Sequence, residues 1–410
     1  MLKETTRKGV ESRPAWPMLE SFARQQIQGF LQRVLEEEIT ELVGRAKSER
    51  RAPQEPPVYR NGYGKPRQLT MTGGTITLRR PRIRGNEEGF ESQVLPLFKR
   101  RTEEVGALLP QLYLHGLALG DFELAFRGLL GEGAALSPAT MLRLKADWQI
   151  EYEAWQRRSL EELDIVYLWA DGLYVKAGLE DGKAALLVLI GADTEGQKHV
   201  LAIESGQRES TECWTSVLRD LRARGLKAPR LTMADGHLGI WGALAQIYPE
   251  SAEQRCWNHK MINVLDQVPL KKQAAVKAHL RKMMYAESRA ECERLRKQCV
   301  VQFKKLYSKA MAVLERDWER MVTFFDFPQE HWKHLRTTNV IESPFAAVRL
   351  RTSAGKRYKK VENACALIWK LLMVAEKTFR RLNAPALLRD VAAGMKYKDG
   401  IKVHSNRVAA

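Results

Sequence analysis

The chain has 410 residues, a formal net charge of +18 at pH 7 and a hydrophobic content of 44%. This size and composition predict a globular protein of two or three domains, and the clustered positive charge favours nucleic acid as a partner. Five scattered cysteines without a CxxC pair exclude a disulfide framework and a four-cysteine zinc site. The absence of a signal peptide pattern and of a long apolar run predicts a cytoplasmic protein without a membrane anchor.

The N-terminal part of the chain combines a long amphipathic helix with a β-hairpin. Apolar residues recur with helical period over residues 17–44, and a polar, proline-bearing linker follows, so residues 1–56 form the first predicted segment. Residues 69–78 alternate around Gly73 and Gly74, a pattern typical of a hairpin. The hairpin runs directly into a basic cluster, which we expect to contact DNA phosphates: Arg79, Arg80, Arg82 and Arg84.

Residues 102–163 have a helical pattern with one break, between Gly131 and Ser137. Ser137 and Pro138 provide an N-cap and a first-turn proline for a new helix, so the segment is helix, turn, helix. One interpretation is an ordinary helical pair in a bundle; the other places the second helix in a DNA major groove. The second interpretation requires three exposed side chains: Thr140, Arg143 and Lys145. The surrounding charge favours it, and we assign residues 57–163 to DNA binding.

Residues 164–268 show the pattern of an α/β core with two aspartates at strand ends. Asp171 follows the apolar residues 165–170, and Asp235 follows the apolar residues 231–234. Each carboxylate is therefore expected at or just past the end of a buried strand. Strands come first, and strand and helix then alternate, which is the succession of a ribonuclease H-like core.

A third acidic residue, Glu342, lies near the start of a predicted helix. Pro344 restricts it to the first turn or the cap of that helix. Two strand-borne aspartates and a helix-borne glutamate can converge on two divalent ions and cut phosphodiester bonds. Between the second and third acids, residues 269–330 lack strand signals and predict an all-helical insertion. Residues 331–395 are assigned to C-terminal helices of the core, and residues 396–410 to a basic tail.

Basic residues follow Glu342 on the same predicted helix and beyond it. Arg349 lies two helical turns after Glu342, so both are expected on one side, where metal and scissile phosphate are held together. Further basic residues in this stretch are expected to contact DNA: Arg351, Lys356 and Arg357.

Cys256 and His259 form a CxxH pair, which has the chemistry to bind zinc. Two ligands make an incomplete site, and the sequence offers no second pair at a suitable spacing. The pair is therefore interpreted as structural or as shaping the active site rather than as a zinc site. His237, directly after Asp235 and Gly236, is expected to hydrogen-bond to a metal-binding carboxylate rather than to bind the metal itself.

Several short motifs occur together in the order and spacing of one family. They are Arg60–Tyr63, Gly74–Arg82, Ala170–Gly172, Ala234–His237, Gln254–Lys260 and Thr337–Ser343. The chain resembles the Mutator-type bacterial insertion-sequence transposases, a DDE family with a ribonuclease H-like core interrupted by a helical insertion. The resemblance extends over roughly residues 60–352 and is specific because order and spacing agree together. It places the family's catalytic acids on Asp171, Asp235 and Glu342, in agreement with the interpretation above.

The resemblance implies metal-dependent DNA cleavage and strand transfer at the terminal inverted repeats of an insertion sequence. Two Mg²⁺ ions, or Mn²⁺ in their place, are the implied cofactors. Water is the first nucleophile and the freed 3′-hydroxyl the second, without a covalent protein–DNA intermediate. The implied partners are double-stranded DNA, as inverted repeats and target, and further copies of the chain in a homodimer or larger assembly at the nucleoid.

Two alternatives remain from other functional classes. The first is a DNA-binding regulator that retains the transposase fold without cutting, although such a protein has no chemical need for three acids. The second is a structure-specific ribonuclease H-like nuclease such as a junction resolvase. The long helical insertion and the large N-terminal region argue against it by analogy of architecture.

Overall fold

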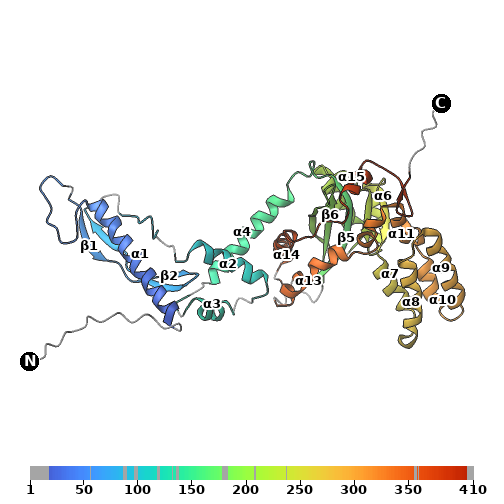
Figure 1. The fold of residues 1–410 in the computed structure, drawn as a ribbon, viewed down its shortest axis with the longest axis horizontal. Helices are drawn as coiled ribbons and strands as arrows, with labels where there is room; N and C mark the ends of the chain where they lie inside the picture. Colours follow the sequence, from blue (N-terminus) through green and yellow to red (C-terminus); the bar gives the residue numbers. More distant parts are fainter. Residues whose placement is uncertain are drawn as a thin grey trace, which may run out of the picture. The chain divides into compact units, whose positions relative to one another are not determined.

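Two compact units make up the chain, Met1–Leu142 and Arg143–Ala410. Figure 1 follows the chain from blue to red, and helix α4 (Pro138–Gln156) contains the boundary between the units. The computed structural model describes residues 18–55, 57–85, 90–96, 100–117, 121–131, 133–134, 138–177, 183–206, 209–236, 238–354, 358 and 360–403. The segment limits expected from the sequence stay predictions.

In the first unit, helix α1 (Leu19–Val43) packs against small antiparallel sheets (Figure 1). Their strands are β1 (Tyr59–Tyr63) paired with β4 (Pro81–Arg84), and β2 (Arg67–Met71) paired with β3 (Gly74–Leu78). Leu35 of α1 joins Leu69 and Ile76 of the β2–β3 hairpin in one buried apolar cluster. The Gln32 side chain accepts a hydrogen bond from Arg79 N (3.0 Å) and donates one to Arg79 O (2.9 Å). The structure thus contains the helix and the hairpin that the sequence predicts.

Helices α2 (Glu103–Leu114) and α3 (Phe122–Leu130) complete the described part of this unit. The hydroxyl of Thr75 in the hairpin donates a hydrogen bond to Leu130 O (2.9 Å), which fixes the end of α3. The chain leaves α3 at Gly131 with φ of +91°, a left-handed conformation that favours glycine. Helix α4 begins at Pro138 as expected, whereas Ser137 lies outside the described residues.

A five-stranded mixed sheet in the order β7-β6-β5-β8-β9 forms the centre of the second unit. The first three strands are antiparallel, and the last two run parallel to β5. Their bounds are β5 (Ile165–Lys176), β6 (Lys183–Asp193), β7 (Lys198–Gly206), β8 (Leu231–Ala234) and β9 (Ala252–Arg255). This is the succession that the sequence predicts for a ribonuclease H-like core. Only β9 was not predicted, because its residues Glu253, Gln254 and Arg255 are polar.

Helices cover both faces of this sheet. On one face, Leu168 and Ala170 of β5 pack with Trp214 and Ile240 of helices α5 (Thr211–Ala223) and α6 (Leu238–Ile247). On the other face, the indole of Trp169 donates a hydrogen bond to His334 O (3.1 Å). The helices on that face are α12 (Trp332–Leu335), α13 (Asn339–Ala354) and α14 (Val361–Glu376). Successive residues of β5 therefore serve two different packing layers.

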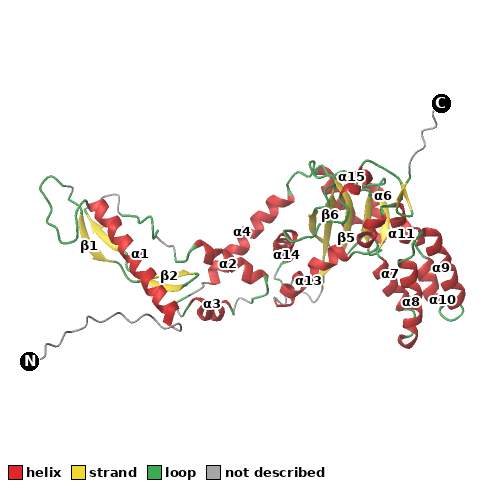
Figure 2. Cartoon of the chain, in the orientation of Figure 1, coloured by secondary structure: helices red, strands yellow, loops and turns green. Residues whose placement is uncertain are grey.

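Residues 269–330 contain only helices and turns, in agreement with the predicted insertion (Figure 2). Its α-helices are α8 (Gln273–Met284), α9 (Arg289–Phe303), α10 (Ser308–Glu315) and α11 (Trp318–Val322), preceded by α7 (Trp257–Leu265). Short 3-10 turns occur at Leu270–Lys272, Thr323–Asp326 and Gln329–His331. Of the helices in the described parts of the chain, none has both the length and the apolar character needed to cross a membrane.

The first residues of the predicted basic tail are folded. Helix α15 (Ala386–Ala392) leads to a small hairpin of β10 (Tyr397–Lys398) and β11 (Ile401–Lys402). The Tyr397 side chain is buried, and the Asp399 carboxylate accepts a hydrogen bond from Arg289 N (2.6 Å) at the start of α9. Residues 396–403 of the predicted basic tail are therefore folded against the insertion, and the assignment of residues 396–410 as a tail stays a prediction.

Candidate active site

The register between β5 and β8 brings two aspartates together. The parallel pairing of these strands ends where Ala170 lies opposite Ala234. The next residue is an aspartate in both segments, so Asp171 and Asp235 lie beside each other where the two strands separate. The sheet thus presents two carboxylates at one opening, and the prediction that Asp235 follows a buried strand is confirmed.

The predicted position of Asp171 at a strand end is wrong. Strand β5 continues to Lys176, and Asp171 pairs with Val188 in the middle of its ladder with β6. The long partner strand β6 keeps β5 extended through Gly172, although glycine often marks a turn. Only the pairing with β8 ends before Asp171, so β5 has no β8 partner at that residue.

Burial and neighbouring charge raise the pKa of Asp171 to about 7. Desolvation is the main cause, and the nearby Asp235 carboxylate and that of Glu342 act in the same direction. The Gly172 N–H, which donates to Asp171 Oδ1 (2.8 Å), and His259 oppose the rise. The other two acids and His259 are therefore within electrostatic reach of Asp171. Two adjacent carboxylates in a desolvated setting favour a bound cation.

Glu342 lies in the first turn of α13, as predicted from Pro344. Its backbone N–H donates to Thr338 O (3.0 Å), which opens the helix. The Thr338 hydroxyl donates a hydrogen bond to Glu342 Oε1 (2.6 Å). One carboxylate oxygen is thereby fixed while the helix start holds the backbone, so the glutamate has a defined pose.

Cys256 and His259 lie next to Glu342. Cys256 precedes α7, and its Sγ accepts from Thr338 N (3.4 Å); His259 Nδ1 lies 3.9 Å from Glu342 Oε1. The ligand atoms of these three residues all lie within 4.8 Å of one another. The hydrogen bond with Cys256 raises the pKa of His259 to about 9, and the neighbouring acids add to this effect. The interpretation that Cys256 and His259 shape the active site stays a prediction.

Comparison with known proteins shows the family. The family model described as "Transposase, Mutator family" matches residues 7–381. The chain belongs to the Mutator family of transposases. The transposase for insertion sequence element IS6120 of Mycolicibacterium smegmatis is 42% identical over 293 residues, which are 72% of this chain and 91% of that protein. The transposase for insertion sequence element IST2 of Acidithiobacillus ferrooxidans is 42% identical over 275 residues, 67% of this chain and 93% of that one.

Among solved structures, this transposase is similar to the Drosophila P element transposase strand transfer complex. The similarity covers 69% of this chain and 83% of that one, at 12% sequence identity and a TM-score of 0.30. A likeness of this size supports no conclusion about the geometry of the site.

The motif Gln254–Lys260 of this transposase has two sets of contacts. Cys256 and His259 face Glu342, as described above. Its other side chains bind the helical insertion: Gln254 and Trp257 donate to Met321 O (3.2 and 2.9 Å), Gln254 Oε1 accepts from Phe324 N (2.8 Å), and Lys260 donates to Arg316 O. Sequence reasoning missed this second role. The available signal was the presence of Gln, Arg and Lys in a segment flanked by buried elements.

Arg255 connects the insertion to the Asp235 turn. Its Nε donates to Asp235 O (3.3 Å), and its Nη1 lies 2.9 Å from Asp317 Oδ2. Gly236 has φ of +102°, and a Cβ there would lie 2.1 Å from Arg255 Nε. The glycine after Asp235 is thus required by both its backbone conformation and the packed guanidinium.

A cleft of about 740 Å³ opens beside Asp235 in the transposase. Residues from four elements or turns line it, among them Glu209, Ser210, Asp235, Arg255, His259 and Asn263. It combines carboxylates with the cationic Arg255 and His259, a mixture suited to a metal-bound phosphate. The sequence analysis did not single out Glu209, which carries no motif of its own.

The remaining predicted residues of the second unit are placed differently. Arg349 is exposed on α13, and its role at the scissile phosphate stays a prediction. Arg351 is only 4% exposed, so the structure does not place it at a DNA-binding surface. The helical period explains this, because Arg351 continues the buried stripe of Ile341, Phe345 and Val348. Three predicted residues lie outside the described ones: His237, Lys356 and Arg357.

The predicted DNA-binding side chains of residues 57–163 differ in exposure. Arg79, Arg82 and Arg84 are exposed, whereas Arg80 is half-buried, with its guanidinium 5.3 Å from the ring centre of Phe90. In the following helix, Arg143 is exposed and Lys145 is half-buried. Thr140 is also half-buried, and its hydroxyl accepts a hydrogen bond from Arg101 Nη2 (3.3 Å). The Thr140 hydroxyl is therefore already hydrogen-bonded within the protein, whereas the groove-binding interpretation requires it to contact a DNA base.

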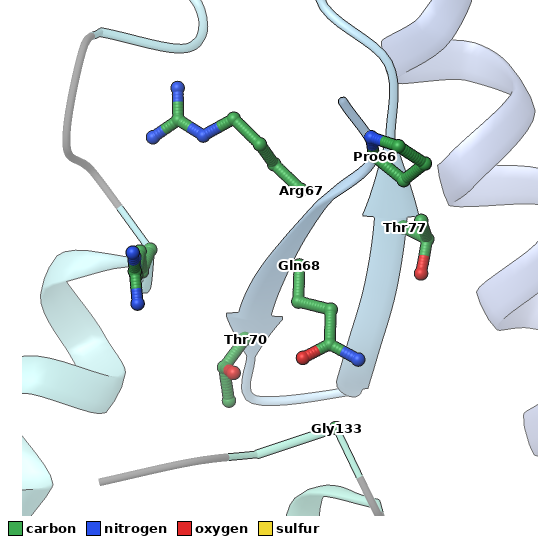
Figure 3. A pocket seen from close by; sticks show the side chains of 7 residues that line it. Pro66, Arg67, Gln68, Thr70, Thr77 and Gly133 are labelled. Carbon is green, nitrogen blue, oxygen red and sulfur yellow. The ribbon is translucent and has the colours of Figure 1, made fainter. Parts of the chain in front are cut away.

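A pocket of about 400 Å³ adjoins the β2–β3 hairpin (Figure 3). It is lined by Pro66, Arg67, Gln68, Thr70, Thr77, Arg100 and Gly133. Thr70 exchanges backbone hydrogen bonds with Arg100 O and Thr102 N (both 3.0 Å), so the chain from Arg100 onward extends the hairpin edge. Two arginines and several polar groups therefore surround one hollow, a setting suited to a phosphate.

Proposed function

We propose that this transposase cleaves and joins DNA strands with Asp171, Asp235 and Glu342 as the catalytic, metal-binding acids of a ribonuclease H-like core. The observation that carries the proposal is the register of β5 and β8, which places two aspartates side by side next to the helix-borne glutamate. Burial of adjacent like charges is unfavourable without a cation, and such sites are typical of function. The strand order β7-β6-β5-β8-β9 supports the assignment of the fold.

The donor set fits hard divalent cations. Asp171, Asp235 and Glu342 supply only carboxylate oxygens, which Mg²⁺ prefers and Mn²⁺ accepts. When bound, two such ions stabilise the charge that develops on the attacking and leaving oxygens of an in-line displacement. The raised pKa of Asp171 supports this fit, because a cation replaces the proton that burial otherwise favours.

The other residues of the site position these acids. Thr338 occupies one oxygen of Glu342 by hydrogen bonding, and His259, whose pKa is raised mainly by Cys256, lies 3.9 Å from the same oxygen. Arg349, exposed further along the same helix, is assigned to the phosphate of the substrate strand. These contacts hold the Glu342 carboxylate in place near the two aspartates, although the negative charges of the acids repel one another.

The substrates are assigned from the relatives, whose names refer to insertion sequence elements. The DNA consists of the terminal inverted repeats of such an element and a target duplex. Water attacks first and releases a 3′-hydroxyl, which then attacks the target phosphodiester. A homodimer or larger assembly holds the two ends together.

The decisive experiment measures strand cleavage and joining by purified protein on labelled DNA that carries the element ends, with Mg²⁺. Glu342→Gln is expected to abolish both reactions while end binding persists. Glu362→Gln, in the exposed first turn of α14, is the matched control and should retain wild-type activity. End binding without cleavage by the wild-type protein, across metals and end designs, would favour the regulatory alternative.

The first unit is assigned to binding of the element ends, through Arg79, Arg82, Arg84 and the hairpin pocket. Arg82→Gln and Arg100→Gln are each expected to reduce the slope of log affinity against log salt by about 1, because each removes one phosphate contact. Fluorescence anisotropy with duplex ends at increasing salt measures this slope. Arg127→Gln serves as the control, since Arg127 pairs with Glu123 on α3 (2.7 Å). Unchanged slopes in both test variants would remove the hairpin surface from the DNA interface.

A further inference from the structure

We infer that Glu209 is a fourth acidic residue of the active site and binds a divalent ion together with Asp235 on the cleft side. The inference rests on the proposed function of the three acids and extends it. Glu209 lies between the end of β7 and the start of α5, far in sequence from all the motifs of the family resemblance.

The first observation is the contact between Glu209 and Gly172, the residue after Asp171. A Cβ at Gly172 would lie 2.2 Å from Glu209 Oε1 and 2.5 Å from its Cδ. The carboxylate of Glu209 therefore rests directly on the backbone of β5 at Gly172, on the face of the strand that Leu168 and Ala170 turn toward α5 and α6. Only glycine permits this approach, which explains the Asp-Gly pair better than a turn does, since β5 continues without one.

The second observation is the proximity of Tyr174 to Glu209. Burial, and then the Glu209 carboxylate, raise the pKa of Tyr174, and the carboxylates of Asp235 and Asp171 act in the same direction. The Tyr174 hydroxyl is therefore within electrostatic reach of Glu209 and of both aspartates.

The third observation is the rigid backbone around Glu209. Ser210 caps α5 by accepting from Cys213 N (3.3 Å), which fixes the residue directly before it. Gly239 of α6 approaches so closely that a Cβ there would lie 2.4 Å from Glu209 O. Helix α6 follows Asp235 within a few residues, so packing joins the backbones of Glu209 and Asp235.

Glu209 and Asp235 line the same cleft, and His259 and Asn263 line it as well. Glu212 lines the same cleft one helical turn further on, but it has no comparable contact with β5 and its carboxylate is fully exposed. The geometry therefore distinguishes Glu209 from an acidic residue that only borders the cleft.

The experiment measures binding of Mn²⁺ alone to the full chain, by electron paramagnetic resonance or calorimetry without DNA. Glu209→Gln is expected to weaken Mn²⁺ binding by about 10-fold or more, as loss of groups that hold or orient a metal ligand does. Gly172→Ala should produce a similar loss, because the added Cβ displaces the Glu209 carboxylate. The double variant should lose little more than either single variant. Glu362→Gln, in the exposed first turn of α14 and outside the cleft lining, is the matched control and should bind as the wild type does.

The outcomes separate this inference from the proposed function. Wild-type affinity in Glu209→Gln, together with a loss in Asp235→Asn, would overturn the role of Glu209 and leave the three-acid site intact. Undiminished Mn²⁺ binding in Asp171→Asn, Asp235→Asn and Glu342→Gln would overturn the proposed site itself. Thermal unfolding of each variant shows whether a loss reflects misfolding. Tyr174→Phe, which removes only the hydroxyl, provides a second, milder variant and is expected to weaken binding less than Glu209→Gln does.

Discussion

Asp171→Asn is expected to stabilise the metal-free transposase at about pH 8 while reducing strand cleavage on the order of 10³-fold. The carboxylate of Asp171 is buried beside Asp235, and its pKa is raised from 3.8 to about 7. Asparagine has nearly the same shape and no charge. The substitution therefore removes an unfavourable charge from the folded protein and a proposed metal ligand from the site.

The pH dependence follows from the direction of this pKa change. Between the ordinary pKa of 3.8 and the folded pKa of about 7, the folded protein retains a proton that the unfolded chain has lost. Wild-type stability therefore falls as the pH rises through this window, and the cost is fully present above it. The advantage of Asp171→Asn should be absent below about pH 4 and greatest above about pH 7, with an upper limit of about 4 kcal/mol.

Urea unfolding in EDTA at acidic, intermediate and alkaline pH measures this difference. Asp164→Asn is the control, because Asp164 is 58% exposed and pairs with an exposed Lys227, so its loss should change stability by less than about 1 kcal/mol. Added Mg²⁺ should stabilise the wild type and not the variant, since the ion binds the folded site. A variant less stable than wild type at alkaline pH would show that the charged Asp171 carboxylate does not destabilise the folded protein.

Local patterns in the sequence were sufficient to place two of the three acids. Asp235 follows a short apolar strand, and Pro344 restricts Glu342 to the first turn of its helix. The sequence pattern assigns Asp171 to the correct strand but places it at the end of that strand, whereas it lies within β5. The continuation of β5 depends on its ladder with β6, and no pattern within β5 contains that information.

Contacts between distant segments account for most of what the sequence did not reveal. Strand β9 has no apolar alternation, and it is held by its pairing with β8 and by the contacts of Gln254 with the insertion. Glu209 reaches Gly172 only because β7 and the start of α5 return to β5. Arg351 was expected on a surface because its neighbours are basic, although its helical position belongs to the buried stripe.

Asp317→Asn is expected to destabilise the transposase by about 3 kcal/mol and to slow strand cleavage by about 10-fold or more. Asp317 and Arg255 form a 2.9 Å ion pair in which their side chains are only 17% and 8% exposed. Removal of one charge leaves the guanidinium of Arg255 desolvated beside Asp235 O. Asparagine tolerates the left-handed conformation of Asp317 (φ of +56°), so the loss reports on charge rather than on backbone strain.

The effect on catalysis follows from the second contact of Arg255. Its Nε holds Asp235 O and packs on Gly236, so a guanidinium released from Asp317 is expected to shift the turn that carries this proposed catalytic acid. Arg320 also contacts Asp317, at 3.4 Å, and pairs with Glu253 of β9, so the insertion and the sheet share one ionic network. The helical insertion thus stabilises the turn at Asp235 through the contact of Asp317 with Arg255.

Urea unfolding and single-turnover cleavage test this coupling in the same preparations. Glu319→Gln is the matched control, because its pair with Arg289 also joins insertion helices but is 79% exposed at the carboxylate, and such pairs contribute less than about 1 kcal/mol. Asp317→Asn with wild-type stability and cleavage would show that the Asp235 turn is held without the insertion. A stability loss with unchanged cleavage would instead confine Arg255 to a structural role, because a displaced Asp235 cannot retain its metal geometry.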